Sequence, residues 1–223
     1  MRSDIDAIAF DIDGTLYPNS ALYRRIFPFL LKNFALMKAF GTVRRRIRSF
    51  QEENPGCASA DFFSWQQDLL CEESGVSTAR AERFFSDIYE GWRPVFERIR
   101  PFPGVREAFL ACKEAGLKIG ILSDFLPSQK GSIWDLAPLA DVILGSEETG
   151  ALKPSPIPFV ALAERLGVAP GRVLYVGNSV PSDIVGGRAA GMKTALIAPP
   201  FRGDARADIS FSSYRKLTAL VLK

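Results

Sequence analysis

The sequence contains no histidine, and this absence excludes several kinds of chemistry. Serine–histidine triads, histidine metal sites and acid–base catalysis by imidazole all need that side chain. Carboxylates and lysines are therefore the side chains that we expect to carry charge and to transfer protons at a catalytic site.

Cysteine is also scarce: Cys57, Cys71 and Cys112 lie far apart and lack the paired spacing of a metal site. An odd number of thiols does not favour a disulfide framework, so we expect a cytoplasmic location. The most apolar stretch, residues 26–40, is interrupted by a proline, an asparagine and two lysines. It falls short of the ~18 apolar residues of a membrane span, so we expect none. The acidic residues near the start predict no export signal.

Charge of one sign does not dominate either, because 28 Lys and Arg face 25 Asp and Glu, for a net charge of +3. This surplus is too small to indicate a nucleic-acid partner, but it suits a small anionic substrate. Hydrophobic residues make up 47% of the chain and charged residues 24%, as in a globular protein with a sizeable core. The 223 residues allow one α/β core and a smaller accessory domain.

Four short apolar runs each end in a cluster of polar residues and precede a helical pattern. Strands that alternate with helices predict a doubly wound parallel sheet, which is a Rossmann-like α/β core. The predicted strands are Ala7–Phe10, 117–122, 141–144 and 173–176, with edge strands at 194–198 and Ile209–Phe211 and a last helix at 214–222. Ligands bind beyond the carboxyl ends of such strands, so we expect the polar clusters to converge there.

Residues 18–99 break this alternation and show helical spacing throughout. The predicted helices are 19–40, 42–53, 60–74 and 78–98, with Gly41 separating the first two and a turn at 54–56. We therefore predict a helical bundle inserted after the first strand. Residues 18–99 would form this accessory domain, and residues 1–17 and 100–223 would form the core.

The insert begins with a strongly basic stretch. Between Ser20 and Gln51 there is no acidic residue, and the eight basic ones are Arg24, Arg25, Lys32, Lys38, Arg44, Arg45, Arg46 and Arg48. This stretch can steer phosphorylated substrates or contact an acidic partner or membrane surface. We favour the alternative, a solvated helix face balanced by later acidic residues such as Glu72 and Glu73.

Asp11 and Asp13 follow the first predicted strand, in the segment Asp-Ile-Asp-Gly-Thr. Side chains two apart on an extended strand share a face, so both carboxylates are expected in one pocket. One can attack phosphorus, and the other, when protonated, can donate to the leaving oxygen and later activate water. For this pair alone, an acidic turn after a strand is the favoured alternative.

Two later segments offer groups that bind phosphate. Ser123 ends the second predicted strand, and its hydroxyl and the Asp124 amide can contact a phosphate oxygen. Lys153 precedes Pro154, which we expect to open a helix and to hold the lysine extended, with its ammonium near the carboxylates. The alternatives are a helix cap at Ser123 and an ordinary solvated lysine.

The segment from Gly177 to Asp183 offers oxygen ligands for a hard cation such as Mg²⁺, through Asn178 and Asp183. The alternative is a capped helix start, with Asn178 or Ser179 as cap and Pro181 in the first turn. Four strand ends thus supply a carboxylate pair, a hydroxyl, a lysine and an oxygen-rich loop, in that order. Turn chemistry alone does not explain this combination.

With these motifs the chain resembles the haloacid dehalogenase (HAD) superfamily over residues 5 to about 222. The resemblance is carried by Asp11-x-Asp13-Gly14-Thr15-Leu16, by Ser123, by Lys153 in Leu-Lys-Pro, and by Gly177-Asn178-Ser179 to Asp183. It implies that Asp11 is the nucleophile, Asp13 the acid–base, and Ser123 and Lys153 the phosphate binders. It also implies a Mg²⁺ site made by the fourth motif, Asp11 and the Asp13 carbonyl, under a helical cap that selects substrates.

The fourth motif commonly begins Gly-Asp, and this sequence has Asn178, whose carbonyl oxygen is neutral. Either metal affinity is lower or Asp183 carries more of the charge, and the sequence leaves both open. Within the superfamily, Asp13 argues against a dehalogenase, whose chemistry proceeds without that acid.

The predicted function is a Mg²⁺-dependent phosphatase that hydrolyses a small-molecule phosphomonoester, such as a nucleotide or sugar phosphate, through an aspartyl-phosphate. A sugar phosphomutase of the same superfamily and a non-catalytic binding protein that uses the basic insert are the alternatives.

Overall fold

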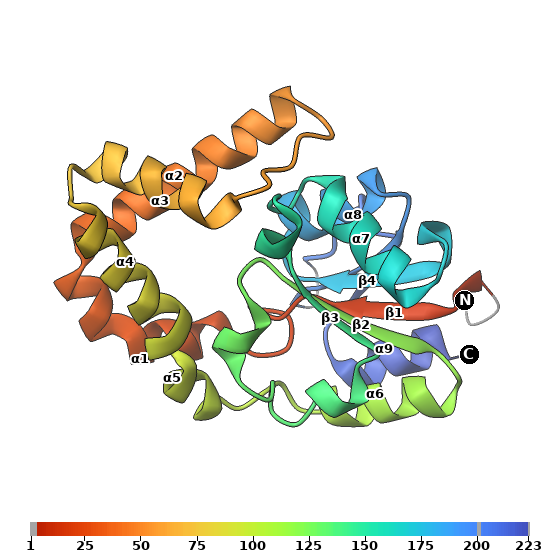
Figure 1. Cartoon of the computed structure of the whole chain (residues 1–223). Helices are drawn as coiled ribbons and strands as arrows, with labels where there is room; N and C mark the ends of the chain where they lie inside the picture. The colour runs from red at the N-terminus through yellow and green to blue at the C-terminus, as the bar shows by residue number, and fades with distance from the viewer. Residues whose placement is uncertain (1–3, 200–201, 223) are drawn as a thin grey trace.

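The computed structural model describes residues 4–199 and 202–222 and contains a six-stranded sheet in which all neighbouring strands are parallel. The strand order is β3-β2-β1-β4-β5-β6 (Figure 1). The strands are β1 (Ala7–Phe10), β2 (Lys118–Ser123), β3 (Val142–Gly145), β4 (Val173–Gly177), β5 (Lys193–Ile197) and β6 (Ile209–Phe211). Each lies within one residue of its predicted bounds, and the predicted α/β fold class is confirmed. Residues 1–3, 200–201 and 223 of the predicted core lie outside the described residues.

Helices cover both faces of the sheet. On one side lie α6 (Val105–Glu114) and α9 (Tyr214–Val221), and on the other lie α7 (Pro156–Leu166) and α8 (Val185–Ala189) (Figure 1). Ile8 and Phe10 of β1 belong to the apolar cluster on the α6 and α9 side, whereas Ala7 and Ala9 pack in a second cluster with Phe159 of α7. Burial on both faces explains why the strands read as continuous apolar runs and do not alternate with polar residues.

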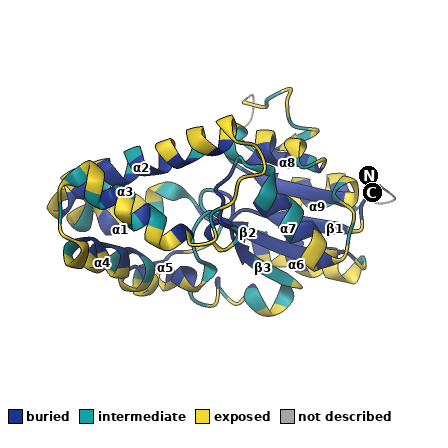
Figure 2. Ribbon diagram, turned by 45° about the horizontal axis from the view of Figure 1, so that its top comes forward, coloured by how far each residue is buried: buried dark blue, intermediate teal, exposed yellow. Residues whose placement is uncertain are grey.

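A group of helices is inserted between β1 and α6, beside the carboxyl ends of the strands (Figure 1). These helices are α1 (Asn19–Lys32), α2 (Phe34–Glu53), α3 (Phe62–Ser74), α4 (Thr78–Ser86) and α5 (Arg93–Glu97). Their buried residues face inward and their exposed residues outward (Figure 2). The buried insert residues and those on the α6 side of the sheet form one continuous cluster, so the insert and the core share an apolar interior.

The predicted break at Gly41 is wrong, because the first helix ends at Lys32, with Asn33 as its cap, and α2 runs through Gly41. The Asn33 amide donates to the Phe29 carbonyl oxygen at 3.2 Å, and Arg80 donates to Asn33 Oδ1 at 2.6 Å. A glycine inside a helix costs only about 1 kcal/mol. The buried side chains of α2 on either side of Gly41, among them Phe40, outweigh that cost.

The predicted helix 78–98 is also interrupted. After α4 the chain forms one π-helical turn, Asp87–Gly91, and α5 then begins at Arg93 with Pro94 in its first turn. Proline has no N–H to continue an existing helix, but it fits the first turn of a new one. Pro94 is therefore the residue from which the start of a new helix could have been predicted.

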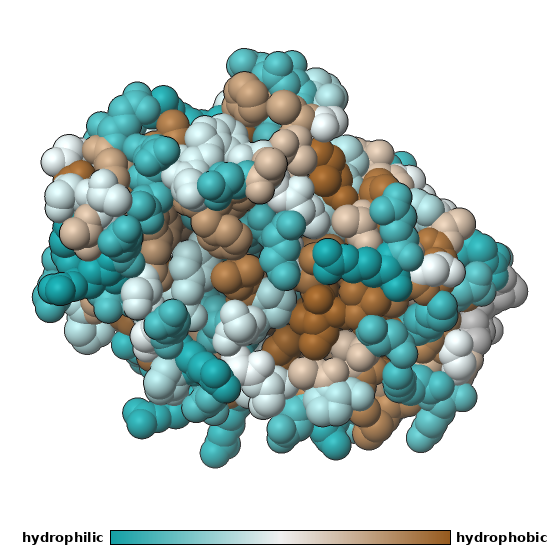
Figure 3. Space-filling model, viewed as in Figure 1, coloured by the Kyte–Doolittle hydropathy of each residue, from teal (hydrophilic) through white to brown (hydrophobic). Residues whose placement is uncertain are grey.

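Polar and apolar side chains are intermixed on the surface shown in Figure 3. Apolar side chains gather in the area that corresponds to β2 and β3 in Figure 1. β3 is an edge strand, and its Val142 and Ile143 are only partly buried. Within the described residues no single helix has the length and apolar composition to cross a membrane. Among the described helices, only α1 and α2 taken together pass that test, and they bend by 110° at their break.

Candidate active site

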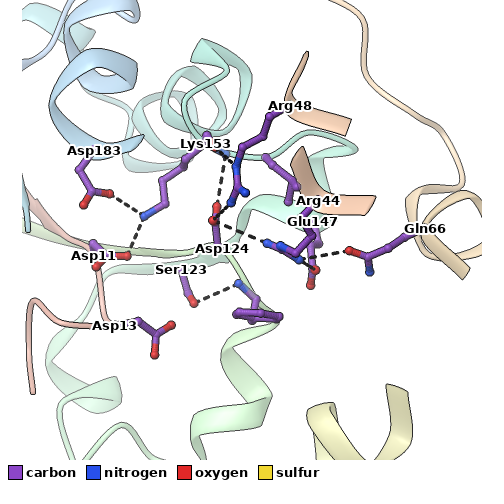
Figure 4. Close-up of polar contacts among 12 residues, drawn as sticks. Asp11, Asp13, Arg44, Arg48, Gln66, Ser123, Asp124, Glu147, Lys153 and Asp183 are labelled. Atoms are coloured by element: carbon purple, nitrogen blue, oxygen red, sulfur yellow. Dashed lines mark hydrogen bonds and ion pairs between the residues drawn. The ribbon is translucent and has the colours of Figure 1, made fainter. Parts of the chain in front are cut away.

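The predicted site residues come together beyond the carboxyl ends of β1, β2 and β4 (Figure 4), and all of them except the fully buried Ser123 line one cavity. Asp11 follows β1, Ser123 ends β2, and Asn178 and Asp183 follow β4. Because β1 pairs with both β2 and β4, these chain ends are neighbours at one edge of the sheet. The central strand therefore places Asp11 between the other groups, as the parallel topology predicts.

Lys153 joins the two buried carboxylates of this site. Its Nζ lies 2.7 Å from Asp11 Oδ1 and 2.7 Å from Asp183 Oδ1, and it donates to the Tyr175 hydroxyl at 3.2 Å. The Lys153 side chain is 3% exposed, so it is not the solvated lysine of the alternative interpretation. Helix α7 begins at Pro156, not at Pro154 as predicted. The lysine thus lies in the loop before the helix, and its ammonium group is paired with both carboxylates.

Burial dominates the electrostatics of this cluster. Burial, which is opposed by the attraction of Lys153 and aided by the nearby carboxylates of Asp183 and Asp13, raises the pKa of Asp11 to about 7. Burial alone would lower the pKa of Lys153, but the carboxylates of Asp11 and Asp183 raise it well above the usual range. The lysine therefore stays charged, while Asp11 can exchange a proton near neutral pH.

Asp183 is fixed by the backbone of the loop that follows β4. Its Oδ2 accepts hydrogen bonds from the Asn178 and Ser179 amides at 3.1 and 2.9 Å. A Cβ on Gly177 would collide with the Asp183 side chain, so only glycine permits this approach. Ser179 also caps the following turn by accepting from the Ser182 amide at 3.3 Å. The loop after β4 therefore contains both a capped turn, at Ser179, and a predicted site residue, Asp183, so the two sequence interpretations of this segment are compatible.

Asp13 lies in the loop after β1 and contacts two residues that the sequence did not reveal. Tyr17 donates a hydrogen bond to Asp13 Oδ1, and Lys130 Nζ lies 3.1 Å from Asp13 Oδ2. The Lys130 side chain is fully buried, with its Nζ over the rings of Phe96 and Phe125 at 4.6 and 5.5 Å. Asp13 and Asp11 line the same cavity. Because β1 ends at Phe10, Asp11 and Asp13 do not share the face of a strand, contrary to the prediction. The loop after β1 brings both carboxylates to the cavity.

Ser123 is fully buried, and its Oγ accepts a hydrogen bond from the Phe125 amide at 3.2 Å. The carboxylate of Asp124 accepts from the Lys153 amide at 3.2 Å and from Arg48 at 2.8 Å. Burial would raise the pKa of Asp124, but Lys153, Arg44 and Arg48 hold it below its usual range. The Asp124 side chain therefore ties the loop of Lys153 to the insert (Figure 4).

The basic stretch is not simply a solvated face, and this prediction is wrong for two of its residues. Arg44 is buried and forms an ion pair with Glu147 at 2.5 Å, and Arg48 donates to the Lys153 carbonyl oxygen at 2.8 Å. Arg46, in contrast, pairs with the later acidic residues Glu72 and Glu73, as the favoured interpretation expected. The spacing of Arg44, Arg48 and Gln51 on one face of α2 is the signal that could have identified this contact.

The site opens into a cavity of about 260 Å³ between the core and the insert. The core contributes polar and charged side chains, including four aspartates and Lys153, and also Phe125. The insert contributes Asn19, Leu22, Tyr23, Ile26, Leu30, Met37, Phe40 and Trp92. The cavity therefore has a charged wall and an apolar wall.

The donors on the charged wall fit a magnesium ion. The Thr15 hydroxyl lies 2.8 Å from Asp11 Oδ2 and 3.2 Å from Asn178 Oδ1, so it links a carboxylate and an amide oxygen. Among the described residues no three His, Cys, Asp or Glu side chains are placed to hold a metal, so Mg²⁺ would also need Asn178 and the Asp13 carbonyl. An all-oxygen set with excess negative charge is what this ion takes.

Comparison with known proteins gives a consistent result. A family model described as haloacid dehalogenase-like hydrolase matches residues 5–191. The chain is 26% identical to a glyceraldehyde 3-phosphate phosphatase of Methanopyrus kandleri, over 86% of this chain and 84% of that one. It is 27% identical to a ribulose-1,5-bisphosphate 5-phosphatase of Halopiger xanaduensis, over 96% and 98%. The structure resembles a HAD phosphatase from Thermococcus onnurineus, with a TM-score of 0.63, 22% identity and coverage of 97% and 98%.

Proposed function

Since the chain belongs to the haloacid dehalogenase-like hydrolases, we propose that it is a magnesium-dependent phosphatase that hydrolyses a small-molecule phosphomonoester through a phosphoryl group on Asp11. The names of the two relatives support a phosphomonoester substrate. The observation that carries the proposal is the ion pairing of Lys153 with Asp11 and Asp183 on the wall of a cavity that Asp13 also lines.

In the first half of the reaction, a carboxylate oxygen of Asp11 attacks phosphorus. A bond forms between this oxygen and phosphorus while the bond from phosphorus to the ester oxygen breaks. Asp13 donates its proton to the departing oxygen, so the alcohol leaves uncharged. Lys153 and the Ser123 hydroxyl hold the oxygens of the transferred group.

In the second half, water attacks the phosphorus of the aspartyl-phosphate. Asp13, now ionised, takes a proton from this water, and the bond between phosphorus and Asp11 breaks. Inorganic phosphate leaves, and both carboxylates return to their starting state. Tyr17 and Lys130 keep Asp13 in place for both transfers.

Asp11, Asn178, Asp183 and the Asp13 carbonyl would hold Mg²⁺, which supplies positive charge that offsets the phosphoryl oxygens and the carboxylates. Asn178 contributes a neutral oxygen. Asp183 has two amide hydrogen bonds besides its ion pair with Lys153, whereas Asp11 has the same ion pair and one hydrogen bond from Thr15, so Asp11 has one partner fewer. The ionised form of Asp11 is both the nucleophile and the better metal ligand.

Residues 18–99 act in this proposal as a cap over a core made of residues 1–17 and 100–223. The cavity is walled by α1 and α2 of the insert, and Arg48 contacts both Asp124 and the carbonyl of Lys153. The cap would thus recognise the alcohol part of the substrate. Lys153 is the only cation among the described residues that line the cavity, which favours water over a second sugar phosphate as acceptor and hence a phosphatase over a phosphomutase.

The test is detection of the phosphoryl group on Asp11. The enzyme is mixed with a phosphomonoester and Mg²⁺ and quenched in acid, and the peptide that contains Asp11 is analysed by mass spectrometry. We expect the added mass of one phosphoryl group, and we expect Asp11→Asn to lose both this adduct and the release of phosphate. Asp204→Asn, which changes an exposed surface pair, is the matched control and should behave as the unaltered enzyme. Turnover by Asp11→Asn would refute the proposal.

A further inference from the structure

The insert wall of the cavity contains no charged side chain among its described residues. Six of its members have apolar side chains: Leu22, Ile26, Leu30, Met37, Phe40 and Trp92. The remaining two, Asn19 and Tyr23, are neutral polar residues. A substrate whose phosphate meets Lys153 therefore places its alcohol part against apolar atoms.

The nearby arginines do not change this property. Arg44 is engaged by Glu147 at 2.5 Å and Arg48 by Asp124 at 2.8 Å, and neither lines the cavity. A second phosphate or a carboxylate on the substrate would lie against this wall without a cationic partner. Burying an unpaired charge is strongly unfavourable, and placing a hydroxyl against the six apolar members of the wall also costs free energy.

From this wall we infer that the substrate is a phosphomonoester of an apolar alcohol, with one ring or one short branched chain and no second charge. The inference rests on the proposed phosphatase function and narrows its substrate class. Size supports it, since an apolar cavity of about 150 Å³ accepts benzene. The cavity of about 260 Å³ leaves room for the phosphoryl group beside such a part. The substrates named for the two relatives are polar, so this chain is expected to differ from them.

The test compares two esters of nearly the same shape. In 2-methylbutyl phosphate, methyl groups replace the two free hydroxyls of glycerol 3-phosphate. We expect kcat/KM for phosphate release, with Mg²⁺ present, to be at least about tenfold higher for the 2-methylbutyl ester, because it places two more apolar groups against the wall. Glyceraldehyde 3-phosphate and ribulose 1,5-bisphosphate, which also carry polar groups in this part, should likewise be poorer substrates than the 2-methylbutyl ester.

Adjacent residues supply a matched pair of variants. Leu30 lines the cavity, whereas Leu31 is 62% exposed and does not. Leu30→Gln should lower the preference for the 2-methylbutyl ester, mainly through its KM, and Leu31→Gln should leave the preference unchanged. Met37→Gln, which is nearly isosteric, repeats the test at a second position on the wall if Leu30→Gln does not fold.

The outcomes separate the two proposals. Release of phosphate from glycerol 3-phosphate or glyceraldehyde 3-phosphate in preference to the 2-methylbutyl ester would overturn the inference and leave the phosphatase function intact. An equal loss of preference in Leu30→Gln and Leu31→Gln would overturn it as well. No release from any of the four esters, with or without Mg²⁺, would instead refute the proposed function.

Discussion

At the scale of single residues, Lys130 is the clearest addition to the site. Its charge is fully buried, it lies 3.1 Å from Asp13 Oδ2, and it also donates to Gln129 Oε1 at 2.7 Å. A buried ammonium is costly unless it is paired, so this lysine and Asp13 hold each other in position. In the proposed mechanism Lys130 would not contact the reacting atoms, and it would act as a positioning residue through Asp13.

Lys130→Met should therefore impair proton donation by Asp13. We expect kcat/KM for an alkyl phosphate to fall by about ten- to a hundredfold, a part of what a general acid contributes. For dinitrophenyl phosphate, whose leaving group needs no proton, the fall should be much smaller. The measurement is kcat/KM for both esters, with Lys118→Met at the start of β2 as the matched control. An equal loss for both esters would mean that Lys130 has a structural role only.

The sequence predicted the residues at strand ends but not Lys130. Asp11, Ser123 and Asn178 follow apolar runs whose burial on both faces fixes where each strand ends, so their convergence is a consequence of the parallel sheet. Lys130 is brought to Asp13 by a short 3₁₀ turn, Pro127–Lys130, between β2 and β3. No periodicity in the sequence marks the direction of a side chain in such a segment.

At the scale of elements, helix α2 holds the insert against the core. Arg44, Arg48 and Gln51 face the core at helical spacing, and Gln51 both donates to the Gly150 carbonyl and accepts from the Leu152 amide, at 3.2 and 3.1 Å. These contacts reach the loop that carries Lys153. The position of α2 and the position of Lys153 are thus physically linked.

Glu147→Gln should weaken this attachment. It leaves the buried Arg44 without its closest carboxylate, and breaking a buried ion pair costs about 3 kcal/mol. The free energy of unfolding, measured with urea, should fall by about that amount. Glu72→Gln, which breaks an exposed pair with Arg46, is the matched control and should cost under about 1 kcal/mol. Similar losses in both variants would contradict the role of the Arg44–Glu147 pair.

The helix boundaries of the insert show what element-scale patterns miss. Gly41 looked like a break because glycine disfavours helices, but the buried side of α2 extends across it. Asn33 ends α1 through hydrogen bonds to Phe29 and Arg80, and the second of these depends on tertiary structure. The existence of the bundle followed from periodicity, whereas its breaks depended on partners distant in the sequence.

At the scale of the whole molecule, the cluster of carboxylates should make stability depend on pH and on Mg²⁺. Burial raises the pKa of Asp11 to about 7, well above its value in an unfolded chain. Between about pH 4 and pH 7 the folded protein therefore binds more protons at this residue than the unfolded chain does. Asp11 contributes its full stabilisation below pH 4, and this contribution is lost as the pH rises through 7.

In EDTA, the free energy of unfolding of the unaltered enzyme should thus fall relative to that of Asp11→Asn as the pH rises from 4 to 8, by on the order of a few kcal/mol. At pH 8, Mg²⁺ should restore stability to the unaltered enzyme, because a ligand that binds only the folded state stabilises it. It should restore much less to Asp11→Asn, which has lost one of the two charged ligands. Urea unfolding at both pH values, with Asp204→Asn as control, provides the measurement. If Mg²⁺ stabilises Asp11→Asn as strongly as the unaltered enzyme, the ion does not bind at Asp11.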